Sequence, residues 1–445
     1  MITKKITQLT ALFLFIICSS TSAKEQSPPK HIKKQSTNST KLWYKDFFFN
    51  DPSFNFEFVR MLGTSHSEGA DVGECLTAAS KIKNKDFDSW HNAWKELADR
   101  IYKFAEDSNK KGNIVSARNA YFRATSYYQD AGFYYHYPEK LKIAIDCWLK
   151  GRNSFLKAIA SLPNIQTIKI PYENTTLPGY FIKAKNAESK APLLIVNTGY
   201  DGTKEGLYYC VGTAAAERGY HCLLFEGPGQ GEVIALQNLP FRYDWEKVIT
   251  PAVDFAVKLP YVDASRIALM GRSMGGYLAP RAVAFEKRIK ACIANGGVYS
   301  MTENIYKSLT PEVVKLIKSN SAEFNSIIEK YCKYSLTLKW FIDNGLWTFH
   351  VKTPADLFNQ LNKYNMKNIA EKIECSMLII DSEDDMFLAG QPQKLYNALK
   401  CPKTFLKFTK AESAELHCQE GAIAISNEKI FSWLNETFNY YPHKK

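Results

Sequence analysis

The segment that constrains this chain most is residues 271–276, which read Gly-Arg-Ser-Met-Gly-Gly. An apolar run, residues 266–270, comes before it, and a helix-forming segment, residues 277–284, follows. A serine between a strand and a helix sits on a turn too tight for neighbouring side chains, and the flanking glycines supply that room. The start of the following helix directs backbone N–H groups towards any oxyanion beside Ser273. The pattern predicts an exposed nucleophilic serine; a plain strand-to-helix turn of any α/β fold is the alternative.

Apolar strand-like runs alternate with helical segments around this turn. Six runs read as strands of one sheet: residues 192–197, 220–225, 266–270, 290–295, 375–381 and 404–408. Helical segments separate or follow them: residues 204–218, 243–259, 392–399 and 419–438. Residues 165–173 and 179–184 add a β-hairpin at the start. This alternation indicates an α/β fold, with a mostly parallel sheet and helices on both faces.

Two regions without strands accompany the α/β core, which we assign to residues 164–297 and 373–445. Residues 51–163 predict an N-terminal helical domain rich in aromatic side chains, which either form its core or line a substrate pocket. Residues 298–372 predict a helical insertion. Because it interrupts a parallel sheet, we expect it to form a lid over the strand ends and to help select the substrate.

The first 23 residues have the composition of a cleavable export signal. Lys4 and Lys5 precede an apolar stretch, residues 9–18, and small side chains follow at residues 21–23. The apolar stretch is too short to span a bilayer comfortably. Residues 24–50 are rich in Lys, Ser, Thr and Pro and predict a disordered linker. We therefore expect a secreted or periplasmic protein without a membrane span after cleavage.

Charge and cysteine content limit the classes of partner. The formal charge is +12, but the basic residues are mostly scattered, without a basic helix carrying interleaved aromatics or zinc-finger spacing. We expect a small-molecule substrate and no nucleic acid. Nine cysteines remain after residue 23, an odd number without a C-x-x-C motif. Most read as small buried hydrophobes, although Cys401 and Cys418 flank the last strand and could pair.

A serine nucleophile needs a general base and an acid that orients the base. On this architecture the chain order is serine, acid, histidine. His417 and His443 are the histidines that follow an acid-bearing strand, and His443 lies beyond the last helix, so we predict His417 as the base. The acid should lie just after the strand at residues 375–381. Asp385 is the first choice there, with Asp384 and Glu383 as alternatives.

Two further loops belong near the serine. The oxyanion needs the N–H of Met274 and a second N–H from residues 198–202, for which we predict Tyr200 first and Gly199 second. Glu226 ends the strand at residues 220–225 and begins a glycine-rich loop. It is either a substrate-binding or supporting acid of the site, or a structural acid that accepts hydrogen bonds from loop N–H groups.

Together these segments resemble the α/β-hydrolase superfamily, and within it FrsA-like esterases, 2,6-dihydroxypseudooxynicotine hydrolase and fungal pigment-pathway chain-shortening hydrolases. The stretches that carry the resemblance are residues 123–128, 199–203, 226–231, 271–276, 384–387 and 415–418. The resemblance implies that Ser273 is the nucleophile, Asp385 the acid and His417 the base. It also implies no metal or organic cofactor, a cap formed partly by the N-terminal helices, and frequent homodimers. The export signal departs from the mostly cytoplasmic members.

The sequence thus predicts an exported serine hydrolase that cleaves an ester with an apolar or aromatic acyl group. A C–C bond hydrolase acting on a ketone or diketone is the alternative on the same residues, with Glu226 protonating a carbanion-like leaving group. A binding protein that retains the hydrolase fold is the alternative without catalysis.

Overall fold

The computed structural model describes residues 48–185 and 190–442. The predicted export signal, nearly all of the predicted linker and His443 lie outside these residues. Within them, every helix is too short or too polar to cross a membrane.

One eight-stranded sheet forms the centre of the molecule, in the order β1-β2-β4-β3-β5-β6-β7-β8. Its strands are β1 (Ile165–Tyr172), β2 (Thr175–Ile182), β3 (Ala191–Asn197), β4 (His221–Phe225), β5 (Val262–Arg272), β6 (Ala291–Asn295), β7 (Ser376–Ser382) and β8 (Lys403–Phe408). β1 and β2 form the predicted antiparallel hairpin, and β2 also pairs antiparallel with β4. The strands β3 to β8 are parallel to one another. The predicted α/β fold is confirmed. Since β5 lies between β3 and β6, the turn after it opens at the middle of the sheet.

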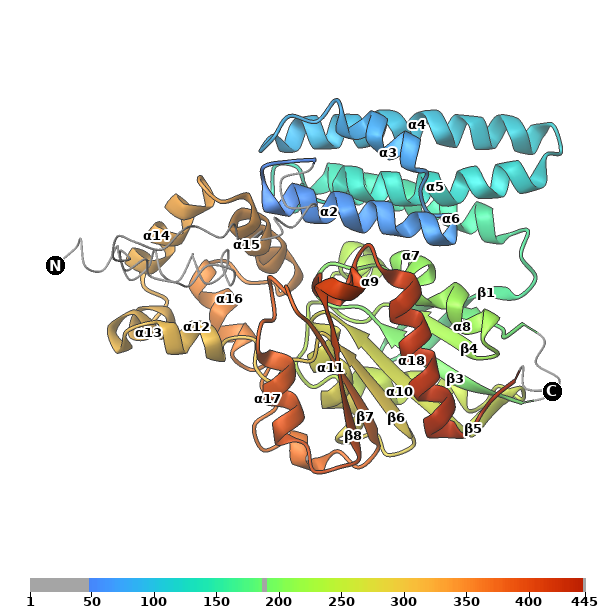
Figure 1. Ribbon diagram of the computed structural model, residues 1–445. Helices are drawn as coiled ribbons and strands as arrows, with labels where there is room; N and C mark the ends of the chain where they lie inside the picture. The colour runs from blue at the N-terminus through green and yellow to red at the C-terminus, as the bar shows by residue number, and fades with distance from the viewer. Residues whose placement is uncertain (1–47, 186–189, 443–445) are drawn as a thin grey trace, which may run out of the picture.

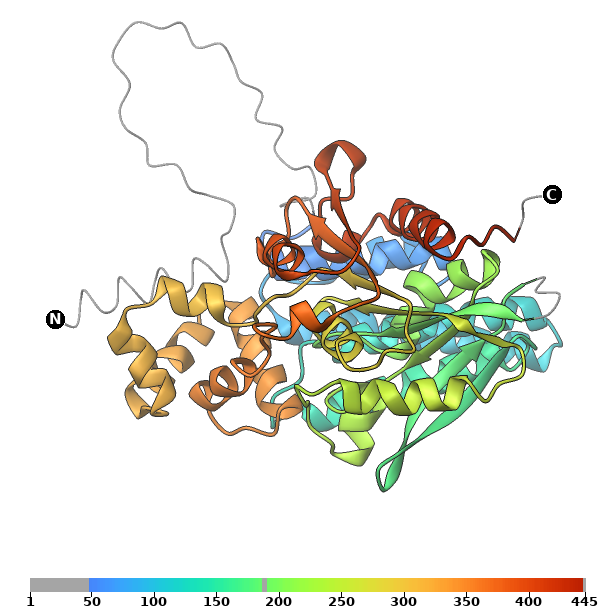
Figure 2. The same ribbon diagram turned by 90° about the horizontal axis from the view of Figure 1, so that it is seen from below.

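Helices cover both faces of this sheet, as its nearly continuous burial requires. On one face, α10 (Glu246–Ala256) packs against α11 (Gly275–Val283), which contacts β5 and β6. α18 (Ile423–Phe438) lies on the opposite face (Figure 2). α17 (Gln391–Ala398) connects β7 to β8.

A layer of long helices lies beside the sheet (Figure 1). It consists of α2 (Pro52–Gly63), α3 (Val72–Ala79), α4 (Phe87–Lys110), α5 (Ile114–Gly132) and α6 (Leu141–Ile159). Side-chain carboxylates of Asp51, Asp71 and Asp86 accept backbone N–H groups at the starts of α2, α3 and α4, which stabilises these helix ends. The fully buried Trp90 and Trp94 pack in the layer. Most of its aromatic side chains therefore form a core.

The predicted insertion lies between β6 and β7 and consists mainly of helices. Its helices are α12 (Glu303–Ser308), α13 (Pro311–Lys318), α14 (Ala322–Cys332), α15 (Leu336–Thr348) and α16 (Pro354–Leu361). They extend to one side of the sheet, next to the end of the helical layer, and α15 contacts α2 (Figure 1). The two helical regions thus meet near the strand ends that carry the serine.

Two predicted helices differ from their observed form. The predicted helix at residues 204–218 consists of α7 (Lys204–Leu207), a π-helical turn (Tyr208–Gly212) and α8 (Thr213–Glu217). The last helix begins at Ile423 instead of residue 419, because Cys418 and Gln419 have φ values of 54° and 55°, which no α-helix accommodates. The other short elements are α9 (Gly231–Gln237) and 3-10 turns at Thr64–Ser67, Ala370–Lys372, Lys410–Glu412 and His417–Gln419.

Candidate active site

Ser273 occupies a strained turn between β5 and α11. Its φ of 58° lies in the left-handed region, which is uncommon for a residue with a side chain. The strain depends on close backbone packing: a Cβ at Gly271 would lie 1.9 Å from the carbonyl oxygen of Gly275, and a Cβ at Gly276 would lie 2.1 Å from that of Gly296. The structure therefore has the sharp strand–serine–helix turn that the glycine pattern predicts.

The structure brings the three predicted catalytic side chains into one hydrogen-bonded chain. His417 Nε2 lies 2.9 Å from Ser273 Oγ, and His417 Nδ1 lies 2.7 Å from Asp385 Oδ2. The other carboxylate oxygen of Asp385 accepts the N–H groups of Phe387 and Leu388 at 2.8 and 2.9 Å. Asp385 is therefore held in place from both sides.

The alternative acids of the same loop serve other contacts. Glu383 accepts the backbone N–H of Lys410 through Oε2, and the N–H of Asp384 donates to the carbonyl of Glu415. Of the three candidates, Asp385 is the one whose carboxylate contacts His417.

Asp385 and His417 shift each other's pKa. Burial favours the neutral acid, but His417 and the two backbone N–H groups outweigh it and lower the pKa of Asp385. Burial also disfavours the imidazolium, but the Asp385 carboxylate raises the pKa of His417 well above 6.5. Because an ionised Asp385 only accepts, Nδ1 carries the proton of the neutral imidazole, and the Nε2 lone pair faces the hydroxyl of Ser273.

The predicted oxyanion loop runs against the serine turn. A Cβ at Gly199 would lie 2.7 Å from the backbone nitrogen of Met274. Gln230 Nε2 donates to the carbonyls of Thr198 and Gly199, at 2.9 and 3.2 Å. Because a trans peptide directs its C=O and N–H to opposite sides, the N–H groups of Gly199 and Tyr200 face away from Gln230. Both remain candidates for the second donor beside Met274, whose N–H precedes the hydrogen bonds of α11.

The side chain of Tyr200 connects this loop to the insertion. Its hydroxyl donates to the carbonyl of Phe341 at 2.6 Å, and its ring stacks on the Phe341 ring. Asn344 Nδ2 donates to the Tyr200 carbonyl at 3.0 Å. The position of the oxyanion loop thus depends on α15.

Glu226 is not among the residues that line the cavity, which contradicts a direct substrate-binding role and leaves the predicted supporting role open. Its carboxylate is fully buried and accepts the backbone N–H groups of Lys204 and Glu232. It also pairs with the Lys204 ammonium at 2.9 Å. The structural alternative describes it: Glu226 fixes the loop that carries Gln230, and so acts on the oxyanion loop from behind.

A cavity of about 340 Å³ opens above Ser273 and His417. Its walls come from α2, α5, the insertion and the loops of the core, so both helical regions contribute. Phe387 and Phe56 pack against the His417 ring, with ring centroids 5.0 and 6.4 Å apart. Phe133 stacks on Trp340 further along the wall. This wall suits an apolar or aromatic group.

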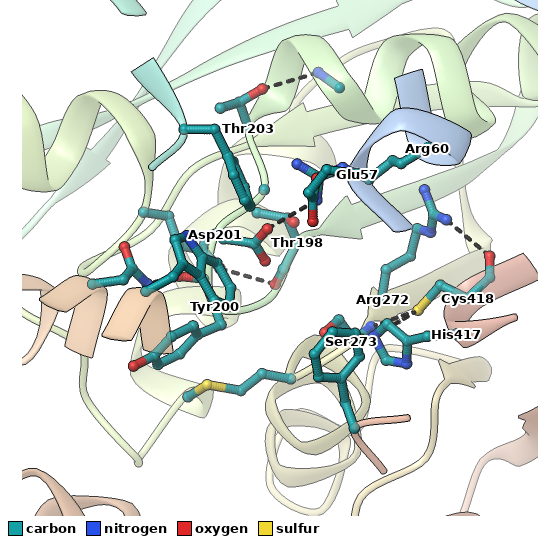
Figure 3. Close-up of a pocket in the computed structure, with 18 of the residues that line it drawn as sticks. Glu57, Arg60, Thr198, Tyr200, Asp201, Thr203, Arg272, Ser273, His417 and Cys418 are labelled. Atoms are coloured by element: carbon teal, nitrogen blue, oxygen red, sulfur yellow. Dashed lines mark hydrogen bonds and ion pairs between the residues drawn. The ribbon is translucent and has the colours of Figure 1, made fainter. Parts of the chain in front are cut away.

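The sequence did not reveal the polar part of the cavity. In Figure 3, Glu57 and Arg60 of α2 and Asp201 of the oxyanion loop gather on one side, and Ser273 and His417 lie on another. Arg60 pairs with Glu57 and Asp201, each at 2.9 Å. α2 carries no motif, so nothing in the sequence indicated that Arg60 contacts Asp201, which lies about 140 positions later in the chain.

Cys418 is a second missed residue. Its sulfur lies 3.2 Å from the backbone nitrogen of Ser273. It is a free thiol, as is Cys401, so the predicted pairing of these two cysteines is wrong. Its place in the stretch at residues 415–418, beside the predicted base, was the available signal. Among residues 48–185 and 190–442, no group of His, Cys, Asp or Glu side chains has the arrangement to hold a metal ion.

A serine–histidine–aspartate triad on a strand–turn–helix of an eight-stranded α/β sheet is typical of hydrolases, and the known proteins that are similar to this chain are hydrolases as well. Residues 245–335 match the prolyl oligopeptidase family. Hydrolase LUC6 of Fusarium sp. and 20-hydroxy-prefusarin hydrolase FUS2 of Gibberella moniliformis are each 32% identical to this chain, over 88% of it and 97% of their own length. The crystal structure of 2,6-dihydroxy-pseudo-oxynicotine hydrolase has a TM-score of 0.67 at 20% identity, covering 86% of this chain and 99% of that one.

The chain therefore belongs to the α/β-hydrolase family, and it is a hydrolase. The similarity to the solved structure shows the fold, including the N-terminal helical region.

Proposed function

We propose that this hydrolase cleaves carboxylic esters with an apolar or aromatic acyl group, through a covalent intermediate on Ser273. The observation that carries the proposal is the hydrogen-bonded chain from Asp385 through His417 to Ser273, which ends in a cavity lined by aromatic rings. We also propose, from the composition of residues 1–23, that the protein acts outside the cytoplasm.

The first step forms an acyl-enzyme. His417 Nε2 takes the proton of the Ser273 hydroxyl as Oγ attacks the ester carbonyl. Asp385 keeps the imidazole oriented and stabilises its positive charge. The N–H of Met274 and that of Tyr200 or Gly199 stabilise the oxyanion, and His417 then donates its proton to the leaving alcohol.

The second step releases the acid. His417, neutral again, takes a proton from water, and the hydroxide attacks the acyl carbonyl through a second oxyanion in the same position. The proton returns to Ser273 Oγ as the acyl bond breaks. The aromatic wall holds the acyl group in both steps.

The carbon–carbon cleavage alternative has less support in this site. Glu226, which the sequence offered as proton donor to a carbanion-like leaving group, is buried against Lys204 outside the cavity, so that proton has to come from His417 alone. The substrate panel described next separates carbon–carbon cleavage from ester hydrolysis.

The test is turnover of p-nitrophenyl esters, from acetate to octanoate and benzoate, alongside a β-diketone panel. Wild-type protein should cleave the esters, and Ser273→Ala should reduce kcat at least 10³-fold. Ser319→Ala, at an exposed serine of the insertion, is the matched control and should retain activity. Full activity of Ser273→Ala would refute the mechanism, turnover of diketones alone would select carbon–carbon cleavage, and no turnover at all would favour a binding protein.

A further inference from the structure

Asp130 is a buried carboxylate in the cavity wall that the proposed reaction does not use. It lies near the end of α5, is 5% exposed and lines the cavity. Its Oδ2 has no hydrogen-bond partner among the described residues. Since burying a polar oxygen without a partner is costly, this atom points to a group that is supplied from outside the chain.

The neighbouring charges do not supply that group. Two guanidinium groups line the cavity, and each already has a carboxylate partner. Arg60 pairs with Glu57 and Asp201 at 2.9 Å, and Arg272 pairs with Glu420 at 3.1 Å. The wall therefore contains four carboxylates against two arginines.

The two histidines of the cavity do not balance this excess either. Burial lowers the pKa of His136 to about 4, so His136 is neutral at physiological pH, and its Nδ1 contacts Asn344. His417 is paired with Asp385.

The electrostatics of Asp130 agree with a missing cation. Burial raises the pKa of Asp130 to about 7, although Arg60 acts against it. Burial likewise raises the pKa of Glu57 well above its ordinary value, and Asp130 adds to that effect. Without a cationic partner, the carboxylates of this wall lose their negative charge only by binding protons.

We propose that Asp130 binds a protonated aliphatic amine of the substrate, so that the enzyme prefers esters that carry a basic nitrogen away from the scissile carbonyl. The ammonium donates a hydrogen bond to Oδ2 and balances the surplus negative charge in one contact. The aromatic rings of the same wall favour a cation over their faces. A neutral hydroxyl could donate to Oδ2 but would leave the charge unbalanced. The inference rests on the proposed ester hydrolysis.

Two substrates of equal length test it: p-nitrophenyl 6-aminohexanoate and p-nitrophenyl heptanoate, which differ in an ammonium against a methyl group. We expect wild-type protein to have the higher kcat/KM for the amino ester, and Asp130→Asn to reduce the ratio of amino to alkyl ester by about 10- to 100-fold, as for a charge-assisted hydrogen bond. Asp99→Asn, a carboxylate of α4 outside the cavity, should leave the ratio unchanged. p-Nitrophenyl 6-hydroxyhexanoate measures the hydroxyl alternative.

A wild-type ratio below one, or an equal ratio in Asp130→Asn, would overturn the inference, as would a preference for the hydroxy ester over the amino ester. Thermal unfolding gives a readout without turnover: hexylammonium chloride should raise the Tm of wild-type protein more than that of Asp130→Asn, and equal shifts would count against it. This readout separates failure of the amine site from failure of the esterase proposal. If Asp130→Asn does not fold, Asp130→Ser replaces it.

Discussion

Gly199→Ala tests the geometry of the oxyanion loop. The added Cβ would lie 2.7 Å from the nitrogen of Met274, 2.9 Å from the carbonyl oxygen of Arg272 and 3.0 Å from Ser273 Cβ. The first two atoms are backbone, so no side-chain rotation relieves the contact. The loop or the serine turn must move by about 0.5 Å or more to restore ordinary contact, and both are fixed by their hydrogen bonds.

That movement displaces an oxyanion donor without removing a chemical group from the site. Loss of one such donor costs roughly 10²- to 10³-fold in kcat, or about 3–4 kcal/mol. We expect a loss of this size in kcat, a KM within a few-fold of wild type, and about 1–3 kcal/mol lower stability from overpacking.

Steady-state kinetics with p-nitrophenyl butyrate and a thermal melt measure both effects. Gly73→Ala on α3 is the matched control, because its Cβ would meet only Asp71 Oδ1, at 3.4 Å, and its kinetics should not change. A folded Gly199→Ala protein with kcat within threefold of wild type would refute the proposed position of the oxyanion donors.

Four further results are expected. Because Asp385 raises the pKa of His417, kcat/KM for a neutral ester should fall with decreasing pH through a midpoint above 6.5; a midpoint below 6 would contradict the coupling. Asp385→Asn should lower kcat about 10⁴-fold, whereas Asp384→Asn should stay within tenfold, and the reverse order would reassign the acid. Burial raises the pKa of Asp130 in the folded protein to about 7, against 3.8 for an exposed carboxyl, so the native state binds this proton more tightly than the unfolded state. The free energy of unfolding in urea should therefore fall by up to about 4 kcal/mol as the pH rises from 4 to 7, and less in Asp130→Asn. The same pH dependence in both proteins would contradict a buried, unpaired carboxyl at Asp130. Glu226→Gln places an amide NH₂ where a carboxylate oxygen accepts a loop N–H, while Lys204 keeps Glu205 and Glu232 at 3.1 and 3.3 Å, so it should cost about 1–3 kcal/mol in the same assay, and a neutral result would contradict its structural role.

The core of the site could be predicted because its signals are local. The glycines around Ser273 report a backbone packing that few other residues permit, and the strand order places the acid and the base on successive loops at one edge of the sheet. His417 and Asp385 follow from that order.

The residues that line the rest of the cavity gave no comparable signal. Arg60 and Asp130 lie on helices whose apolar pattern predicts only that they are helices, and the contact of Arg60 with Asp201 depends on how the N-terminal helices pack against the sheet. For Glu226 the sequence left two roles open, because a glycine-rich loop after a strand fits either. The buried Lys204 decides between them through a tertiary contact.

The left-handed backbone at Cys418 was missed for the same reason. Helical propensity predicts the last helix from residue 419, but the turn that brings His417 to Ser273 delays its start to Ile423. Function here overrides local propensity.

The most direct test of the serine mechanism is covalent labelling with a fluorophosphonate probe, followed by mass spectrometry of the digested protein. We expect one probe per molecule, on the peptide that contains Ser273, with labelling abolished in Ser273→Ala and strongly slowed in Asp385→Asn. Labelling of another residue, or none in folded wild-type protein, would contradict the assignment of Ser273 as the nucleophile.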